Sequence, residues 1–296
     1  MGKYIGIDIG GTKIAGAMYD EAGHELAQIT LPTPDNYPTF LENIRAIVAQ
    51  MEQQNGRADS IGVCSPFLEN SVNMPFMAGK PLSRDLEKFF DRPVPVDNDA
   101  NCAALAEAME GAGKGYNAVF GLIFGTGVGG GFVVNGHIIA GANGMCGEIG
   151  HLPLPFYEES DGDKVLCGCG QYGCIEKLVA GGAVARLYQK LTGKNADARQ
   201  IAGLAQDGDV DALRVLDRYF TVAAKAMVAI LHSFDPDIIT VSGGLNALPG
   251  LYEEVTKRWG QFAVCKNPKT KLVPATFGSM AGLRGAAWLG RNALKR

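Results

Sequence analysis

Charged residues are scarce in this chain. They make up 20% of its 296 residues, and 31 acidic residues outnumber 27 lysines and arginines. The net charge of −4 and the lack of a basic block argue against binding to nucleic-acid phosphates. No apolar run approaches the ~18 residues that span a bilayer, and the first residues, MGKYIGIDIG, lack the features of a secretory signal. We therefore expect a cytoplasmic protein with neither a membrane nor a nucleic-acid partner.

Glycine and cysteine, by contrast, stand out. The 40 glycines are about twice the usual ~7% of a chain, and they gather at residues 10–11, 125–131, 168–173 and 243–244. Seven cysteines is an odd number, and three of them fall within eight residues, a spacing that suits a metal better than a disulfide framework. The length and the 47% hydrophobic content predict a two-domain globular protein.

The hydrophobic pattern predicts an α/β fold in two similar halves. In the first half we expect an antiparallel meander of strands at 4–9, 14–19 and 26–31, then a helix at 38–54, a strand at 60–64, a helix at 83–90, a strand at 93–97 and a helix at 99–109. In the second half we expect strands at 118–124, 130–135 and near 137–140, helices across 174–234, a strand at 237–242, a helix at 250–262, a strand at 271–277 and a helix at 280–294. Duplicated α/β domains of this kind predict a cleft between them that binds a small molecule.

Three glycine-rich turns predict a phosphate-binding site, because consecutive glycines leave backbone N–H groups without side-chain cover. The first, DIGGTK, adds Asp8 to hold a hydrated Mg²⁺, with Thr12 and Lys13 to meet phosphate oxygens. The second, FGTGVGGG, adds the Thr126 hydroxyl, and the third, VSGGLN, follows a strand and is placed to receive a base and ribose. Singly, each is an ordinary tight turn, and none matches the Walker A pattern or a GxGxxG that opens a helix after a strand. The nucleotide-binding candidates are Gly6, Ile7, Asp8, Ile9, Gly10, Gly11, Thr12, Lys13, Gly125, Thr126, Gly127, Val128, Gly129, Gly130, Gly131, Phe132, Gly243 and Gly244.

A carboxylate at a helix start is the candidate catalytic group. The run VPVDNDANCAALAEAM places Asn98 and Asp99 between a strand and a helix. Both residue types are common helix N-caps, yet phosphoryl transfer to a hydroxyl also needs a carboxylate within reach of the acceptor proton. Asp99 can serve both roles.

A histidine and three cysteines predict a metal site. His151 precedes Cys167, Cys169 and Cys174, and this set of four satisfies a closed tetrahedral Zn²⁺ site, which is structural because no position remains for water. The second nitrogen of a zinc-bound imidazole is free to hydrogen-bond, and a substrate hydroxyl is one possible partner. Glu148 and Glu176 would be carried by the same segment and would accept hydrogen bonds from vicinal hydroxyls.

These motifs together resemble the ROK family of bacterial sugar kinases and related repressors, within the actin-like ATPase (ribonuclease H-like) superfamily. DIGGTK is similar to its first phosphate motif, GTGVGGG to its second, DNDANC to its catalytic segment, and GEIGH with CGCGQYGCIE to its zinc and sugar signature. The resemblance implies an N-terminal domain of residues 1–115 completed by the C-terminal helix 281–296, and a second domain of 116–280 that carries structural Zn²⁺. It also implies ATP and Mg²⁺, frequent homodimers, and Asp99 as general base toward a sugar 6-hydroxyl. The implied contacts to the other hydroxyls are Asn98, Glu148, His151 and Glu176.

Three segments, VNMPFMAGKPLSRDL, DNDANCAALAEA and CGCGQYGCIEKLVAGG, are most similar to family members that phosphorylate N-acetyl-D-glucosamine. Fructose, mannose and glucose kinases of the family remain alternatives. The chain departs from the family pattern where CSPF replaces GxPG, with Cys64 and Phe67 in a loop expected beside the sugar. A sugar-binding repressor is the remote alternative; it would need a DNA-reading helix-turn-helix, for which the sequence offers no candidate.

Overall fold

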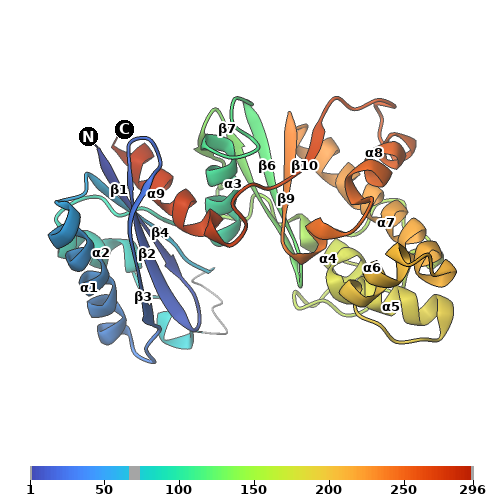
Figure 1. The fold of residues 1–296 in the computed structure, drawn as a ribbon, viewed down its shortest axis with the longest axis horizontal. Coiled ribbons are helices and arrows are strands. Elements are labelled where there is room, and N and C mark those ends of the chain that lie inside the picture. Colours follow the sequence, from blue (N-terminus) through green and yellow to red (C-terminus); the bar gives the residue numbers. More distant parts are fainter. Residues whose placement is uncertain (1, 67–73, 295–296) are drawn as a thin grey trace. The chain divides into compact units, whose positions relative to one another are not determined.

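The computed structural model describes residues 2–66 and 74–294, which form two compact units (Figure 1). Unit 1 comprises Met1–Gly115, Gly136–Ile138 and Phe277–Arg296, and unit 2 comprises Tyr116–Asn135 and Ile139–Thr276. The described residues contain two five-stranded sheets with helices packed on them, which confirms the α/β class. No helix among these residues is both long enough and apolar enough to cross a membrane.

The first sheet has the strand order β3-β2-β1-β4-β5. Its strands are β1 (Lys3–Ile9), β2 (Lys13–Asp20), β3 (Glu25–Pro32), β4 (Ser60–Cys64) and β5 (Val96–Asp97). The first three strands pair antiparallel, as the meander predicted, and β4 and β5 add in parallel beside β1. The helix predicted at 38–54 is confirmed as α1 (Tyr37–Asn55), which packs its buried apolar residues against β2 and β3. The other helices of the first half are α2 (Leu82–Phe90) and α3 (Asp99–Met109).

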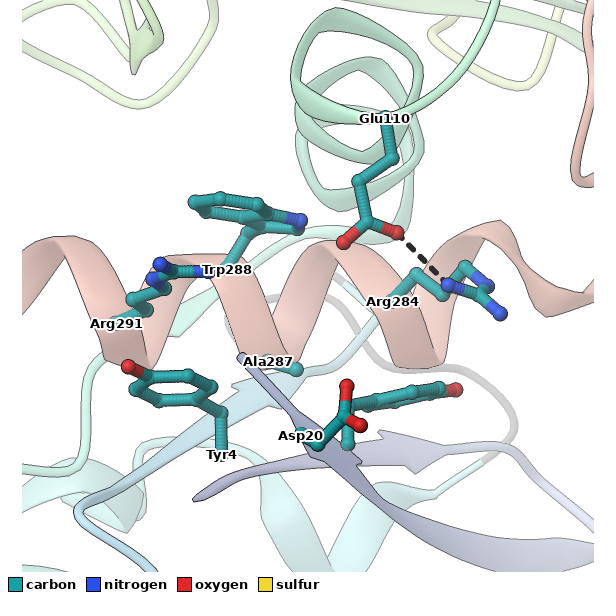
Figure 2. Close-up of a pocket in the computed structure, with 8 residues that line it drawn as sticks. Tyr4, Asp20, Glu110, Arg284, Ala287, Trp288 and Arg291 are labelled. Atoms are coloured by element: carbon teal, nitrogen blue, oxygen red, sulfur yellow. Dashed lines mark hydrogen bonds and ion pairs between the residues drawn. The ribbon is translucent and has the colours of Figure 1, made fainter. Parts of the chain in front are cut away.

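The last helix, α9 (Ala281–Ala293), packs on β1, β4 and α3 of unit 1. Glycines make the close approach possible: a Cβ at Gly6 would lie 2.0 Å from the Leu283 carbonyl oxygen, and one at Gly62 would lie 2.0 Å from that of Ala286. Figure 2 shows residues around α9, where Arg284 of α9 pairs with Glu110, the residue after α3, at 2.7 Å. The pocket drawn there has a volume of about 10 Å³, which is room for about one water.

The second sheet has the order β10-β9-β6-β7-β8, which is the topology of the first sheet repeated. Its strands are β6 (Ala118–Phe124), β7 (Val128–Val134), β8 (His137–Ile138), β9 (Ile238–Ser242) and β10 (Lys271–Pro274). As in the first sheet, the opening strand is antiparallel to the second and parallel to the fourth. The helices of unit 2 are α4 (Ile175–Val179), α5 (Gly181–Thr192), α6 (Ala198–Gln206), α7 (Val210–Phe234) and α8 (Leu251–Phe262). The strand order confirms the duplication that the sequence predicted.

Several strands differ in length from the prediction, and proline or glycine accounts for three of them. β5 has two residues rather than five, because Pro93 and Pro95 have no N–H to donate to a ladder. β10 ends at Pro274. β7 begins earlier than predicted, because Gly129 continues the pairing with β6 instead of belonging to the turn.

Candidate functional site

The first glycine turn joins β1 to β2. The Gly10 N–H donates to the Lys13 carbonyl oxygen at 2.9 Å, and the Thr33 hydroxyl donates to the Gly10 carbonyl oxygen at 2.6 Å, which together fix a tight hairpin. Gly11, Thr12 and Lys13 are exposed. The turn therefore presents uncovered donors of the kind that phosphate oxygens accept from.

Three further nucleotide-binding candidates lie inside β1 rather than in the turn. Gly6, Ile7 and Ile9 are buried. The two isoleucine side chains belong to the hydrophobic core of unit 1, and Gly6 faces α9. The side chains of these residues support the strand beneath the turn and do not extend toward solvent.

Asp8 lies at the carboxyl edge of the first sheet. Asp8 of β1 is in register with Cys64 of β4, and Cys64 is in register with Asp97 of β5. Burial raises the pKa of Asp8 above its ordinary value; a hydrogen bond from the Cys64 thiol and the charge of Lys13 oppose this rise, and the charge of Asp99 adds to it. The arrangement thus sets two carboxylates close enough to repel each other, a feature that a bound cation relieves.

Asp99 occupies the first turn of α3, where its side chain is exposed. Asn98 is the N-cap: its Oδ1 accepts from the Asn101 N–H at 2.7 Å, and Asp99 Oδ1 accepts from the Ala100 N–H at 2.9 Å. The helix start therefore fixes the Asp99 backbone while leaving the carboxylate accessible to a substrate.

The second and third glycine turns lie side by side in unit 2. Gly125 follows β6 and Gly243 follows β9, and these two strands are parallel neighbours. A Cβ at Gly243 would lie 2.6 Å from the Phe124 carbonyl oxygen, and one at Gly125 would lie 3.5 Å from the Gly244 nitrogen. Thr126 at the tip of the second turn is exposed. One ligand can therefore reach the backbone of both turns.

Gly147 and Gly150 let the segment that contains them approach β7 closely. A Cβ at Gly147 would lie 2.1 Å from the Gly130 carbonyl oxygen, and one at Gly150 would lie 2.0 Å from the Val128 carbonyl oxygen. The segment that carries Glu148 and His151 therefore packs directly on β7. This strand contains five of the nucleotide-binding candidates: Val128, Gly129, Gly130, Gly131 and Phe132.

His151, Cys167, Cys169 and Cys174 come together in unit 2, and their ligand atoms all lie within 4.8 Å of one another. His151 Nδ1 is 3.5 Å from Cys167 Sγ, and Cys169 Sγ is 3.5 Å from Cys174 Sγ. Tetrahedral zinc, with bonds of ~2.0 Å to nitrogen and ~2.3 Å to sulfur, separates its ligands by roughly 3.5–3.8 Å. The donor set therefore fits Zn²⁺ in number, type and spacing.

The thiols of this cluster differ in acidity. Burial raises the pKa of Cys174 to about 12, whereas the N–H of Gln171 lowers the pKa of Cys169. A metal ion that binds here must displace the proton of Cys174, so metal binding is expected to weaken as the pH falls.

Two glutamates flank the cluster. Glu148 Oε2 lies 3.9 Å from His151 Nε2, the ring nitrogen that does not face Cys167. Glu176 accepts from the Val128 N–H at 3.4 Å and pairs with Lys177 at 3.0 Å. Although burial opposes the change, these two partners lower the pKa of Glu176. The cluster thus carries an imidazole and two carboxylates that can receive or donate hydrogen bonds to a polyol.

Sequence reasoning missed two contacts around these residues. The Cys64 side chain, which was expected in a loop beside the sugar, lies at the end of β4, is 1% exposed and donates a hydrogen bond to Asp8. Phe67, the other departure from the family pattern, lies outside the described residues. The Lys177 partner of Glu176 was also not foreseen, although the two are adjacent in sequence.

Comparison with known proteins gives a consistent result. A model of the ROK family matches residues 4–293. N-acetyl-D-glucosamine kinase of Escherichia coli O6:H1 is 37% identical over 298 residues, which cover 97% of this chain and 98% of the relative. The crystal structure of ROK hexokinase from Thermus thermophilus is 32% identical with a TM-score of 0.85 and covers 99% of each chain. A ROK family glucokinase from Streptomyces griseus, in complex with glucose and AMPPNP, is 28% identical with a TM-score of 0.73 and covers 98% of this chain and 100% of that one.

Proposed function

Because the chain belongs to the ROK family, we propose that it is an ATP-dependent sugar kinase that phosphorylates the 6-hydroxyl of N-acetyl-D-glucosamine. The observation that carries this proposal is the 37% identity, over 97% of the chain, to a kinase of that name. The glycine turns, the exposed Asp99 and the histidine–cysteine cluster support the same chemistry.

Asp99 acts as the general base. Its exposed carboxylate accepts the proton of the sugar 6-hydroxyl as that oxygen attacks the γ-phosphorus of ATP, and the bond from this phosphorus to the bridging oxygen of ADP breaks. Such a base contributes ~10²–10⁴-fold to the rate. The N-cap of Asn98 fixes the direction from which the carboxylate approaches the hydroxyl.

The glycine turns bind the nucleotide. The turn of unit 1 offers Thr12 and Lys13, and the turn of unit 2 offers Thr126 and uncovered amides, while Gly243 and Gly244 lie beside Gly125 to receive the base and ribose. Asp8 would hold Mg²⁺ through water, a role that fits the rise in its pKa caused by burial and by Asp99. Mg²⁺ would supply neutralisation of the phosphate charge.

The histidine–cysteine cluster would hold a structural Zn²⁺. Four protein ligands leave no open position, so the metal supplies rigidity rather than a bound water. The rigid segment presents Glu148, His151 and Glu176 as hydrogen-bonding partners of the sugar hydroxyls, with Asn98 as a further contact from unit 1.

We also propose that the protein is a homodimer in the cytoplasm. Leu166 and Tyr172 pair in a β-bridge, are 56% and 65% exposed, and offer apolar surface for dimer formation.

A second candidate substrate is glucose, because the structural neighbours include a hexokinase and a glucokinase above 25% identity. Fructose and mannose share the same reaction and remain alternatives. A coupled assay of ADP release over these four sugars separates the possibilities. We expect the highest kcat/KM with N-acetylglucosamine, and a higher value with glucose would assign the protein to the second candidate. If none of the four sugars stimulates ADP release, the kinase proposal itself is wrong.

A further inference from the structure

A buried ion pair in unit 2 joins α7 to the segment between two of the proposed metal ligands. Lys225 of α7 and Asp161 have side chains that are 1% and 0% exposed, and Lys225 Nζ lies 2.8 Å from Asp161 Oδ2. Asp161 lies in the short 3₁₀ helix Glu159–Asp161, in the stretch of chain that runs from His151 to Cys167. Neither charge belongs to the proposed site, and neither is explained by the proposed reaction.

The carboxylate of Asp161 uses both of its oxygens. Oδ1 accepts from Arg218, and Oδ2 accepts from Lys225 and from the Glu158 N–H at 2.7 Å. Arg218 also donates to the Ser160 carbonyl oxygen at 3.1 Å. Arg218 and Lys225 lie two turns apart on α7. Asp161 can therefore accept from both side chains only when its segment lies at one position along the helix.

The same helix holds the chain on the far side of the cluster. The Tyr219 hydroxyl, which is buried, donates to the Val179 carbonyl oxygen at 2.7 Å, at the end of the helix that follows Cys174. α7 therefore fixes both the stretch that joins His151 to Cys167 and the helix that follows Cys174. It sets how far apart the first and last ligands of the cluster can lie.

Burial of such a pair gives little net stability, because the cost of removing two charges from water offsets their attraction. The pair instead fixes the position of the segment on α7. An apolar contact would tolerate small shifts of the segment, whereas Asp161 loses its hydrogen-bond partners when the segment shifts. Such positioning would bring the four ligand atoms of the cluster together, and they do lie within 4.8 Å of one another.

We propose that the Asp161–Lys225 pair is a positioning element for the metal cluster, and that metal retention and sugar affinity depend on it although neither residue contacts metal or sugar. The sugar half of this inference rests on the proposed function; the metal half does not. Both residues are positioning residues rather than catalytic ones.

The test compares four forms of the zinc-loaded protein with the wild type: Lys225→Met, Asp161→Asn, the double variant, and Arg258→Met as control. Arg258 forms ion pairs with Asp217 of α7 and with Glu254, both of which lie outside the segment from His151 to Cys167. Zinc release after addition of a chelator is followed with a colorimetric indicator, thermal unfolding is recorded, and KM is measured separately for sugar and ATP.

We expect both single variants to release zinc about tenfold faster or more and to raise the KM for sugar while the KM for ATP stays unchanged. The control should release zinc at the wild-type rate. The double variant is decisive, because it buries neither charge and should fold even if a single variant does not. Fast zinc release from the double variant with near wild-type unfolding supports positioning. If the double variant releases zinc at the wild-type rate, each buried charge serves only to neutralise the other, and the proposal is overturned.

The two proposals fail in different ways. If the wild type holds zinc but phosphorylates no sugar, the proposed function fails while the release rates still decide the role of the pair. If the purified wild type binds no zinc, the positioning role is overturned, and the sugar assay still decides the function.

Discussion

The two sheets have one strand order but differ in what connects their third and fourth strands. In unit 1 the connection is residues 33–59, which hold α1 alone; in unit 2 it is residues 139–237, which hold the histidine–cysteine cluster and four helices. The opening turns differ too: the first is flanked by Asp8 and Lys13, whereas the second carries no charged residue. The duplicated scaffold fixes where backbone turns lie, and the residues added to each copy decide the chemistry there.

Removal of Asp99, the proposed general base in unit 1, should have the largest effect. Asp99→Asn is expected to lower kcat by about 10²–10⁴-fold, because the proton of the attacking hydroxyl loses its acceptor, while sugar affinity measured by calorimetry stays close to wild type. Asp91→Asn is the matched control, since Asp91 is also exposed and ends α2. Near-normal turnover of Asp99→Asn would remove this residue from the mechanism.

Removal of a metal ligand from unit 2 should affect binding instead of the chemical step. Cys169→Ser is expected to reduce zinc content, lower the unfolding temperature and raise the KM for sugar by about tenfold or more. Cys265→Ser, an exposed cysteine outside the cluster, controls for loss of a thiol. Metal analysis and steady-state kinetics check both variants. A fully active Cys169→Ser protein without zinc would show that the cluster does not support the sugar site.

The same steric clash can be introduced into both units. Alanine at Gly6 or at Gly150 would place a Cβ 2.0 Å from a backbone oxygen, of α9 in one case and of β7 in the other, and each should cost about 1–3 kcal/mol of unfolding free energy. We expect only Gly150→Ala to accelerate zinc release as well, since that glycine holds the His151 segment on β7. Gly203→Ala in α6, where the added methyl meets nothing within 4 Å, should be neutral or stabilising. Equal zinc release from the Gly6 and Gly150 variants would contradict this distinction.

Carboxylates of the two units should respond oppositely to pH. The native pKa of Asp8 is raised above 3.8, so the native state holds this proton to higher pH than the unfolded state, and the stability that Asp8 contributes falls as the pH rises through that window. The native pKa of Glu176 is lowered below 4.5, so its contribution is present at higher pH and is lost as the pH falls through the native pKa.

At pH 7, Asp8→Asn should therefore unfold at a higher temperature than wild type, and Glu176→Gln at a lower one. Both differences should shrink as the pH is lowered toward 3. Thermal unfolding across this range measures them. If both variants shift the unfolding temperature in the same direction at pH 7, the opposite pKa changes of Asp8 and Glu176 are contradicted.

Much of the fold could be predicted because the local signals agree with the tertiary structure. α3 begins and ends where the sequence predicted, since Asn98 supplies the cap and a run of mostly small residues between Ala100 and Ala108 is buried. The prediction was wrong for most of the strand at 93–97. Its apolar pattern is that of a strand, but Pro93 and Pro95 have no N–H to donate, and the Val94 N–H donates to Glu87 Oε1 at 3.4 Å instead of to a ladder partner.

The candidate site was predictable where its residues are close in sequence, as in CGCGQYGC, and not where they are distant. Asp161 and Lys225 are 64 residues apart, so their pairing could not be read from spacing. A partial signal was present: Lys225 is the one charged residue in the run VAAKAMVAIL, and a lysine in such surroundings must find an acidic partner. The buried contact of Cys64 with Asp8 left no comparable trace.

Because α9 covers the face of the first sheet that Gly6 and Gly62 open, the earliest strands to leave the ribosome cannot complete their packing until the last helix has been synthesised. The unit encoded in the middle of the chain has all its parts sooner and can mature first. Assembly order would then run against the order of translation, and the nascent first sheet would expose the face that α9 later covers.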